Sequence, residues 1–153
     1  AAQGAFLDAR VLDVFAGTGA LGLEALSRGA AHALFLDISK PSLGIASENA
    51  VSLGVHSHCE FMIKDASKLE PLCTGIESYD LVFLDPPYRK NLIEPVISRL
   101  EVGGWLASGA WIVVESELLP AQNWTASFTV HGTKIYGETQ ITYLIYQPVQ
   151  MPE

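Results

Sequence analysis

The sequence is short of basic residues. It contains 9 Lys and Arg against 17 Asp and Glu, which gives a formal net charge of −8. Nonspecific affinity for nucleic acids comes mainly from Lys and Arg side chains that neutralise phosphates. The negative net charge therefore argues against a chain that binds a polynucleotide over a wide surface. Any such partner must be held locally, by a further segment or by another protein.

Cysteines and long apolar runs are also scarce. Cys59 and Cys73 form neither a C-x-x-C pair nor a disulfide framework, which favours a reducing compartment. No apolar run reaches the roughly 18–20 residues that a membrane-spanning helix needs, and the N-terminus lacks the basic-then-apolar layout of a signal peptide. A length of 153 residues, of which 49% are hydrophobic, suits one domain over residues 1–153. We expect this domain to be cytoplasmic and monomeric.

Apolar stretches of strand length alternate with segments of helical period along the whole chain. This alternation is typical of α/β proteins. We expect strands at 10–15, 33–37, 59–63, 79–84 and 111–115, helices at 20–28, 39–53, 66–72 and 92–100, and a final hairpin of 128–135 and 140–146. The predicted fold is Rossmann-like, with a mostly parallel seven-stranded sheet, a C-terminal antiparallel hairpin and helices on both faces. Ligands of such sheets bind at the carboxyl ends of the strands.

A glycine-rich turn follows the first expected strand. Residues 17–22 fit G-x-G-x-x-G, and Asp37 lies twenty residues beyond Gly17. Gly17 and Gly19 let a ligand approach the backbone, and a carboxylate at Asp37 can accept the hydroxyl hydrogens of a ribose. The alternative is a tight turn in which Asp37 only caps a loop. The signature by itself does not separate a nicotinamide dinucleotide from S-adenosylmethionine.

Two further acids bear on the choice of cofactor. Asp13 lies inside the first strand, where it can meet the ammonium group of a methionine moiety directly or through water, which favours S-adenosylmethionine. The alternative is a buried acid that loop amides satisfy. Asp65 follows the third strand and can accept a hydrogen bond from an adenine amino group, or it can simply cap a helix.

The strongest motif is Asp85-Pro86-Pro87-Tyr88, directly after the fourth strand. Two prolines remove two backbone donors and stiffen the loop, so the Pro86 carbonyl is free to accept. Asp85 and this carbonyl can hold the two hydrogens of an exocyclic amine, direct its lone pair at a methyl group and stabilise the developing charge. Tyr88 can lie flat against the base. The alternative is a purely structural proline turn.

The other candidate residues have simpler explanations. His56 and His58 form H-x-H without a third ligand nearby, so we expect no metal site. Trp105, Trp111 and Trp124 are best explained by packing. Arg89 and Lys90, beside the motif, are equally compatible with a substrate phosphate and with plain solvation.

Several segments resemble one known family. They read VLDVFAGTGALGLEALSRGA, FLD, NAVSLG, DLVFLDPPY and KIYGETQITYL, and they span roughly residues 10–146. In this they resemble the bacterial 16S ribosomal RNA guanine-N2 methyltransferases, the RsmD family. The resemblance implies a class I methyltransferase fold and S-adenosylmethionine as methyl donor. It also implies a guanine amino group of 16S rRNA as acceptor, within the 30S subunit or an assembly intermediate.

The resemblance also implies site residues. The cofactor contacts of the family carry over to Asp13, Gly17, Gly19, Asp37 and Asp65, with Phe15, Ile38, Ala66 and Asp85 beside them, and the catalytic motif to Asp85, Pro86, Pro87 and Tyr88. The sequence departs from the family in two respects. Family members usually have Glu at the position of Asp37. They also begin with a basic segment, which we expect to be absent or truncated because only residues 1–9 precede the first strand.

Three other functions stay open. DNA or RNA adenine-N6 methyltransferases use a D-P-P-Y motif in the same way, although the DNA enzymes normally add a target-recognition domain. Protein glutamine N5-methyltransferases are similar, but Asn rather than Asp is expected at position 85. The third is a nonenzymatic module that binds the cofactor or RNA.

Overall fold

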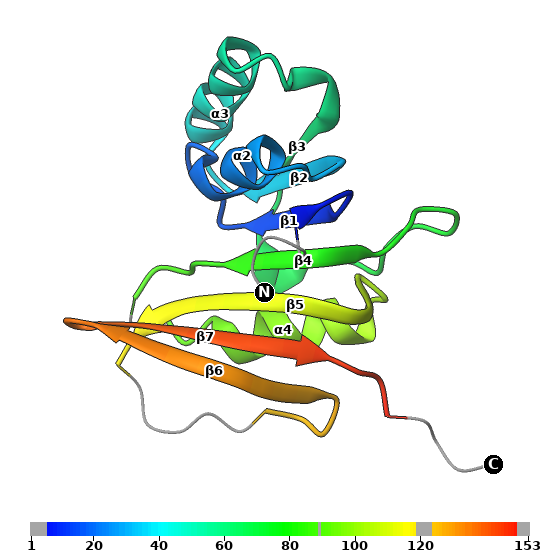
Figure 1. The fold of residues 1–153 in the computed structure, drawn as a ribbon, viewed down its shortest axis with the longest axis vertical. Helices are drawn as coiled ribbons and strands as arrows, with labels where there is room; N and C mark the ends of the chain where they lie inside the picture. The colour runs from blue at the N-terminus through cyan, green and yellow to red at the C-terminus, as the bar shows by residue number, and fades with distance from the viewer. Residues whose placement is uncertain (1–5, 89, 119–123, 150–153) are drawn as a thin grey trace.

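One seven-stranded sheet organises the chain (Figure 1), whose computed structural model describes residues 6–88, 90–118 and 124–149. The strand order is β3-β2-β1-β4-β5-β7-β6. The strands are β1 (Arg10–Val14), β2 (His32–Asp37), β3 (Cys59–Ile63), β4 (Tyr79–Leu84), β5 (Leu106–Glu117), β6 (Phe128–Tyr136) and β7 (Thr139–Tyr146). β1 to β5 pair in parallel, whereas β7 pairs antiparallel with both β5 and β6. The predicted sheet with its C-terminal hairpin is confirmed.

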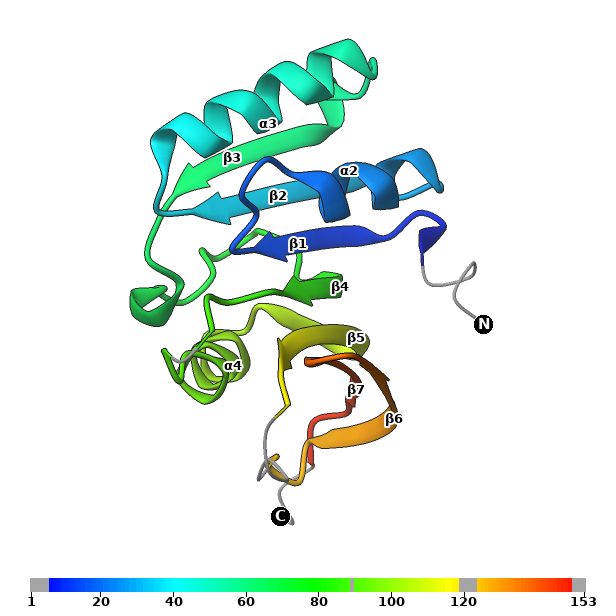
Figure 2. The same cartoon turned by 90° about the vertical axis from the view of Figure 1, so that its left-hand side faces the viewer.

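Helices cover both faces of the sheet. The structure has α2 (Ala20–Ser27), α3 (Lys40–Ser52) and α4 (Ile93–Val102), and the short 3₁₀ helices η1 (His56–His58) and η2 (Ala66–Lys68). Figure 1 shows α2 in front of β1 and β2 and α4 behind β5, and in Figure 2 the strands β5, β7 and β6 curl away from the other half of the sheet. No helix of the described residues is both long enough and apolar enough to cross a membrane.

The alternation of side chains along each strand builds two cores. In β1, Val11 faces the core under α2 and α3, whereas Leu12 faces the core under α4. Both side chains are fully buried, because a central parallel strand is covered on both faces. The continuous apolar runs of the sequence follow from this arrangement.

Two predicted elements had wrong lengths. The expected helix at 66–72 is only the turn η2, because the chain beyond it hydrogen-bonds elsewhere. Leu72 N donates to Gly103 O, and Trp105 Nε1 donates to Glu70 O. The fifth strand is longer than the predicted 111–115. Its first residue, Leu106, pairs with Tyr79, and a register shift separates this pair from the regular pairing that begins at Leu81 and Trp111.

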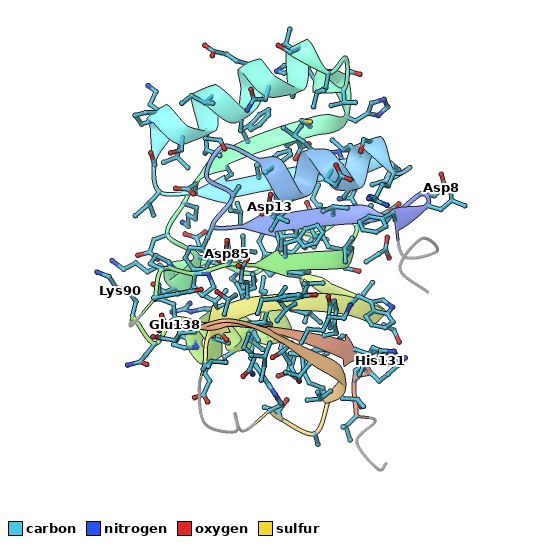
Figure 3. The ribbon with its side chains drawn as sticks, turned by 60° about the vertical axis from the view of Figure 1, so that its left-hand side comes forward. Asp8, Asp13, Asp85, Lys90, His131 and Glu138 are labelled. Carbon is cyan, nitrogen blue, oxygen red and sulfur yellow. The ribbon has the colours of Figure 1, made fainter. Side chains whose placement is uncertain are left out.

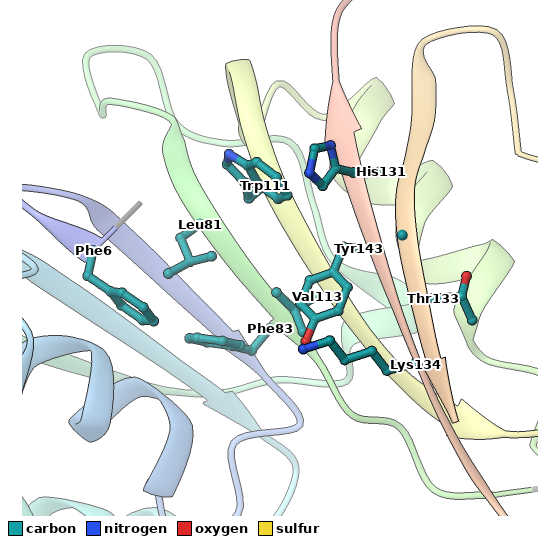
Figure 4. A pocket seen from close by; sticks show the side chains of 10 residues that line it. Phe6, Leu81, Phe83, Trp111, Val113, His131, Thr133, Lys134 and Tyr143 are labelled. Atoms are coloured by element: carbon teal, nitrogen blue, oxygen red, sulfur yellow. The ribbon is translucent and has the colours of Figure 1, made fainter. Parts of the chain in front are cut away.

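One part of the sheet has a cavity of about 480 Å³ on the face that carries α2 and α3 (Figure 4). Its lining is mostly apolar and aromatic, and consists of Phe6, Leu81, Phe83, Trp111, Val113, His131, Gly132, Thr133, Lys134 and Tyr143. The His131 ring meets Trp111 edge-on at 4.8 Å between ring centroids. None of α2, α3 and α4 contributes a residue to this lining.

Candidate active site

A second cavity, of about 650 Å³, opens at the carboxyl ends of the parallel strands. It brings together residues that are far apart in the sequence: Phe15, Leu36, Asp37, Ile38, Lys64, Asp65, Ala66, Ser67, Asp85, Pro86, Pro87, Tyr88, Lys90 and Leu92. Most of the predicted site residues are among them. We call this cavity the edge pocket. Asp13, Gly17 and Gly19 do not line it. Gly17 and Gly19 lie in the turn beside it, and Asp13 lies near the end of β1.

Asp37 fastens the glycine turn to the end of β2. Its Oδ2 accepts a hydrogen bond from Gly17 N at 2.8 Å, and its Oδ1 accepts one from Ser39 N at 2.8 Å. The Gly17 backbone has φ +57°, and no atom lies within 4 Å of where a Cβ would stand. Each carboxylate oxygen has two lone pairs. Asp37 therefore shapes the loop and still has acceptor capacity toward the edge pocket.

Asp13 lies beneath the same turn and is 1% exposed. Its Oδ2 accepts a hydrogen bond from Gly22 N at 3.0 Å. Burial raises the pKa of Asp13 to about 7, against the lowering effect of this hydrogen bond, and the charges of Asp85 and Asp37 raise it further. A Cβ on Gly22 would lie 2.4 Å from Phe35 Cε1, so only glycine lets α2 pack this close. Asp13 thus holds the turn from below, as the buried-acid alternative predicts.

Asp65 caps η2 and also lines the edge pocket. Its Oδ1 accepts hydrogen bonds from Ser67 N at 3.0 Å and from Ser67 Oγ at 2.7 Å. These two bonds lower the pKa of Asp65, which keeps the group ionised. Within the protein, Asp65 therefore acts as the helix cap that the sequence analysis gave as the alternative. Because Oδ1 accepts both bonds, the Oδ2 lone pairs of Asp65 take no part in the capping.

The D-P-P-Y segment also lines the edge pocket. Asp85 is exposed, Pro86 is buried, and Pro87 and Tyr88 are exposed. The Tyr88 hydroxyl hydrogen-bonds the hydroxyl of Thr139, at the start of β7, with an oxygen–oxygen distance of 2.9 Å. This bond fixes the aromatic ring at the mouth of the pocket. The hairpin therefore supports the loop, a role that the sequence analysis missed.

Asp85 has an acidic neighbour. Partial burial of its carboxyl raises the pKa to about 6, and the charge of Glu115 and a hydrogen bond with it act in the same direction. Glu115 comes from β5 and was not among the predicted site residues. Its signal was present, because WIVVE ends in an acid beside the end of β4, but recognising it requires the register of β4 and β5.

The structure places the remaining candidates as follows. Lys90 is exposed and lines the edge pocket, whereas Arg89 lies outside the described residues. Figure 3 shows Lys90 and Asp85 toward one end of the molecule and His131 toward the other. His56 Nε2 is 3.1 Å from Ser47 Oγ. The described residues contain no group of three His, Cys, Asp or Glu side chains that could hold a metal ion.

The fold and the edge pocket define a class, the Rossmann-like S-adenosylmethionine-dependent methyltransferases. The comparison with protein families is more specific. Residues 2–145 match the family described as "Conserved hypothetical protein 95", and the chain belongs to this family, which contains RsmD. It is 37% identical over 144 residues to ribosomal RNA small subunit methyltransferase D of Escherichia coli K12, covering 92% of this chain and 69% of that protein. The Haemophilus influenzae protein of the same name is 40% identical over 120 residues, which cover 74% of this chain and 62% of that protein.

Solved structures agree with this membership. A putative methyltransferase from Escherichia coli superimposes with a TM-score of 0.84 at 33% identity, covering 93% of this chain and 77% of that one. A putative methylase from Haemophilus influenzae has a TM-score of 0.87 at 30% identity, covering 95% and 91%. An RNA methyltransferase from Salinibacter ruber, solved with S-adenosyl-L-homocysteine, shares the fold with a TM-score of 0.66 at 16% identity over 95% of this chain and 84% of that one.

Proposed function

We propose that this protein methylates the N2 amino group of a guanine in 16S rRNA, with S-adenosylmethionine as donor. The observation that carries the proposal is that Asp37, Asp65 and the D-P-P-Y segment line one cavity. Relatives named ribosomal RNA small subunit methyltransferase D supply the substrate class. We further propose that the enzyme acts as a cytoplasmic monomer on the 30S subunit or an assembly intermediate.

The residues of the edge pocket fit the cofactor. Asp37 has lone pairs left for ribose hydroxyls, and Asp65 Oδ2 is outside the capping bonds and suits an adenine amino group. The apolar side chains of Phe15 and Ile38 also line the cavity and suit the adenine faces. The acids of the pocket favour a cationic ligand. When bound, S-adenosylmethionine supplies a methyl group carried on a positively charged sulfur.

The D-P-P-Y segment then positions the acceptor. A guanine amine is a poor nucleophile because its lone pair is delocalised into the ring. Hydrogen bonds to Asp85 and to the Pro86 carbonyl orient the amine, so that its lone pair points at the methyl carbon. As the nitrogen gains positive charge its hydrogens become acidic, and the Asp85 carboxylate stabilises that charge and takes the released proton. Tyr88 offers its ring face to an unpaired or extruded base.

The alternative substrates fit less well. A release factor glutamine methyltransferase from Cereibacter sphaeroides is 40% identical, but over only 81 residues that make up 27% of that protein. Position 85 is Asp, whereas the glutamine enzymes are expected to carry Asn there.

The test is to incubate the protein with 30S subunits that lack the modification and with tritiated S-adenosylmethionine. The expected product is N2-methylguanosine at a single position of 16S rRNA, identified by nucleoside analysis and primer extension. Recovery of N6-methyladenosine, or of label only in protein, would refute the proposal. Naked 16S rRNA run in parallel reports whether the assembled particle is required.

A further inference from the structure

Glu115 lies next to Asp85 at the end of the neighbouring strand. In the parallel pair of β4 and β5, Leu84 is in register with Val114. Positions 85 and 115 are therefore the next step of the same register. Phe83 faces the core under α2 and α3, and Val113 packs against it. Because side chains alternate along a strand, Glu115 continues the same face two residues later.

The two carboxyl groups have each other as partners and little else. They lie within hydrogen-bonding reach of one another. Among the described residues, no backbone N–H donates to either of them, and neither is in an ion pair within 4.0 Å. Ionised carboxylates only accept hydrogen bonds. When both groups are ionised, the pair therefore presents two adjacent acceptors to which no backbone amide of the described residues donates.

The strand order indicates whether the cofactor or the acceptor base contacts the pair of Asp85 and Glu115. Asp37 and Asp65, at the ends of β2 and β3, lie on the β1 side of Asp85, where we propose the cofactor to bind. Glu115 lies on the opposite side, because β5 follows β4 in the sheet. A base whose amine is held by Asp85 can thus extend toward Glu115.

Two adjacent acceptors match the edge of one purine. The Watson–Crick edge of guanine carries two neighbouring donors, N1–H and the N2 amine, which point in the same direction. The edge of adenine carries a donor, the N6 amine, beside the acceptor N1. A carboxylate next to adenine N1 faces another acceptor without a hydrogen between them.

We propose that Glu115 is a specificity-determining residue, which accepts a hydrogen bond from guanine N1–H while Asp85 holds the N2 amine. This inference rests on the proposed function and adds the choice of base to it. It also explains why the site carries an acid on β5 in addition to the D-P-P-Y motif.

The test changes the N1 edge of the substrate, and the Glu115 variants isolate the N1 contact because 2-aminopurine also lacks the O6 of guanine. 2-Aminopurine keeps the N2 amine, but its N1 is an acceptor. A 16S rRNA with 2-aminopurine riboside ligated in at the mapped position is assembled into 30S subunits and compared with the guanosine form in single-turnover methyl transfer. For the unaltered protein we expect guanosine to react about tenfold to a hundredfold faster, the usual discrimination of one base contact.

The Glu115→Gln variant should reduce this preference to within about threefold, because its amide can donate to the N1 of 2-aminopurine. Glu115→Asp retains the acceptor and should keep the preference at a lower rate. Glu48→Gln, at an exposed position of α3, controls for the loss of one charge. Calorimetric binding of S-adenosylhomocysteine and circular dichroism confirm that each variant is folded. If the Glu115→Gln variant proves unstable, Glu115→Ala replaces it and should also weaken the preference.

The outcomes separate the two proposals. A Glu115→Gln enzyme that slows equally on both substrates assigns Glu115 a merely structural role and overturns the inference, as does an unaltered enzyme that does not discriminate. Failure of the unaltered protein to methylate any guanosine overturns the proposed function, and the inference with it.

Discussion

Acidic residues have different roles in the two halves of the sheet edge where the parallel strands end. On the side of β1, β2 and β3, the carboxylates of Asp13, Asp37 and Asp65 all accept hydrogen bonds from backbone amides. On the side of β4 and β5, no backbone amide of the described residues donates to Asp85 or Glu115. The first half is therefore preorganised by the chain itself. The second half keeps its acceptors for a ligand.

The largest effect should come from Asp85. Replacing it with Ala removes the acceptor for the amine, and we expect methyl transfer to fall by about a hundredfold to a thousandfold or more. Affinity for S-adenosylhomocysteine, measured by calorimetry, should stay within about threefold, because the loop-shaping acids are intact. Equal losses of rate and of affinity would mean that Asp85 belongs functionally to the first half.

Asp37 should show the opposite pattern. Asp37→Ala removes the partners of Gly17 N and Ser39 N together with the proposed ribose contact. We expect cofactor affinity to fall about tenfold to a hundredfold, as befits the loss of a charge-assisted hydrogen bond and of loop order. The matched variant Asp37→Glu, which carries the residue usual in the family, should retain most of the affinity. Unchanged calorimetric affinity of the Ala variant would contradict the assignment.

Asp13 tests whether the turn needs an acid or only an acceptor. Its folded pKa of about 7 lies above its ordinary value of 3.8. The contribution of Asp13 to the free energy of unfolding is thus fully present below pH 3.8. It is lost as the pH rises through 7, because the buried group must then ionise. Asp13→Asn cannot ionise and can still accept from Gly22 N. Relative to the unaltered protein, urea unfolding should show a gain of roughly 2 kcal/mol between pH 5 and pH 8. A variant that is equally destabilised at both pH values would show that an ionised cap is required.

Tyr88 should give the smallest effect. Tyr88→Phe removes the hydrogen bond to Thr139 and retains the ring. We expect a loss of about 1 kcal/mol or less in unfolding free energy and a change of a fewfold in methyl transfer. Thr139→Val should reproduce this result, and the double variant should add little. A much larger loss of rate in Tyr88→Phe would indicate that the hydroxyl itself contacts the substrate.

The fold could be read from the sequence because local signals agree with the topology. The predicted strands at 59–63 and 79–84 coincide with β3 and β4. The apolar run of β4 follows from its central position, which buries every residue of the strand except Asp80. The Gly137 turn, at φ +59°, joins β6 to β7 as predicted. The helix expected at 66–72 failed because its backbone finds partners after α4 instead of within itself, and no local pattern reports such a long-range contact.

The candidate site was predictable in its residue types but not in their pairing. Sequence spacing brought Asp37, Asp65 and the D-P-P-Y segment to the same strand ends, and the edge pocket contains them. It left open whether Asp13 is buried beneath the turn, because burial depends on how closely Gly22 lets α2 approach Phe35. It also missed Glu115, whose position beside Asp85 follows only from the register of two strands distant in sequence.

The most direct test of the difference between the two halves is the pH dependence of single-turnover methyl transfer, measured from pH 5 to pH 8 at saturating cofactor. Because the pKa of Asp85 is raised to about 6, its carboxyl gains a proton below that pH and ceases to be a free acceptor. The rate of the unaltered enzyme should therefore fall, approaching tenfold per pH unit below 6. Asp85→Asn should be slower throughout and should lack this decline. The same decline in both enzymes, or none in the unaltered one, would contradict the account.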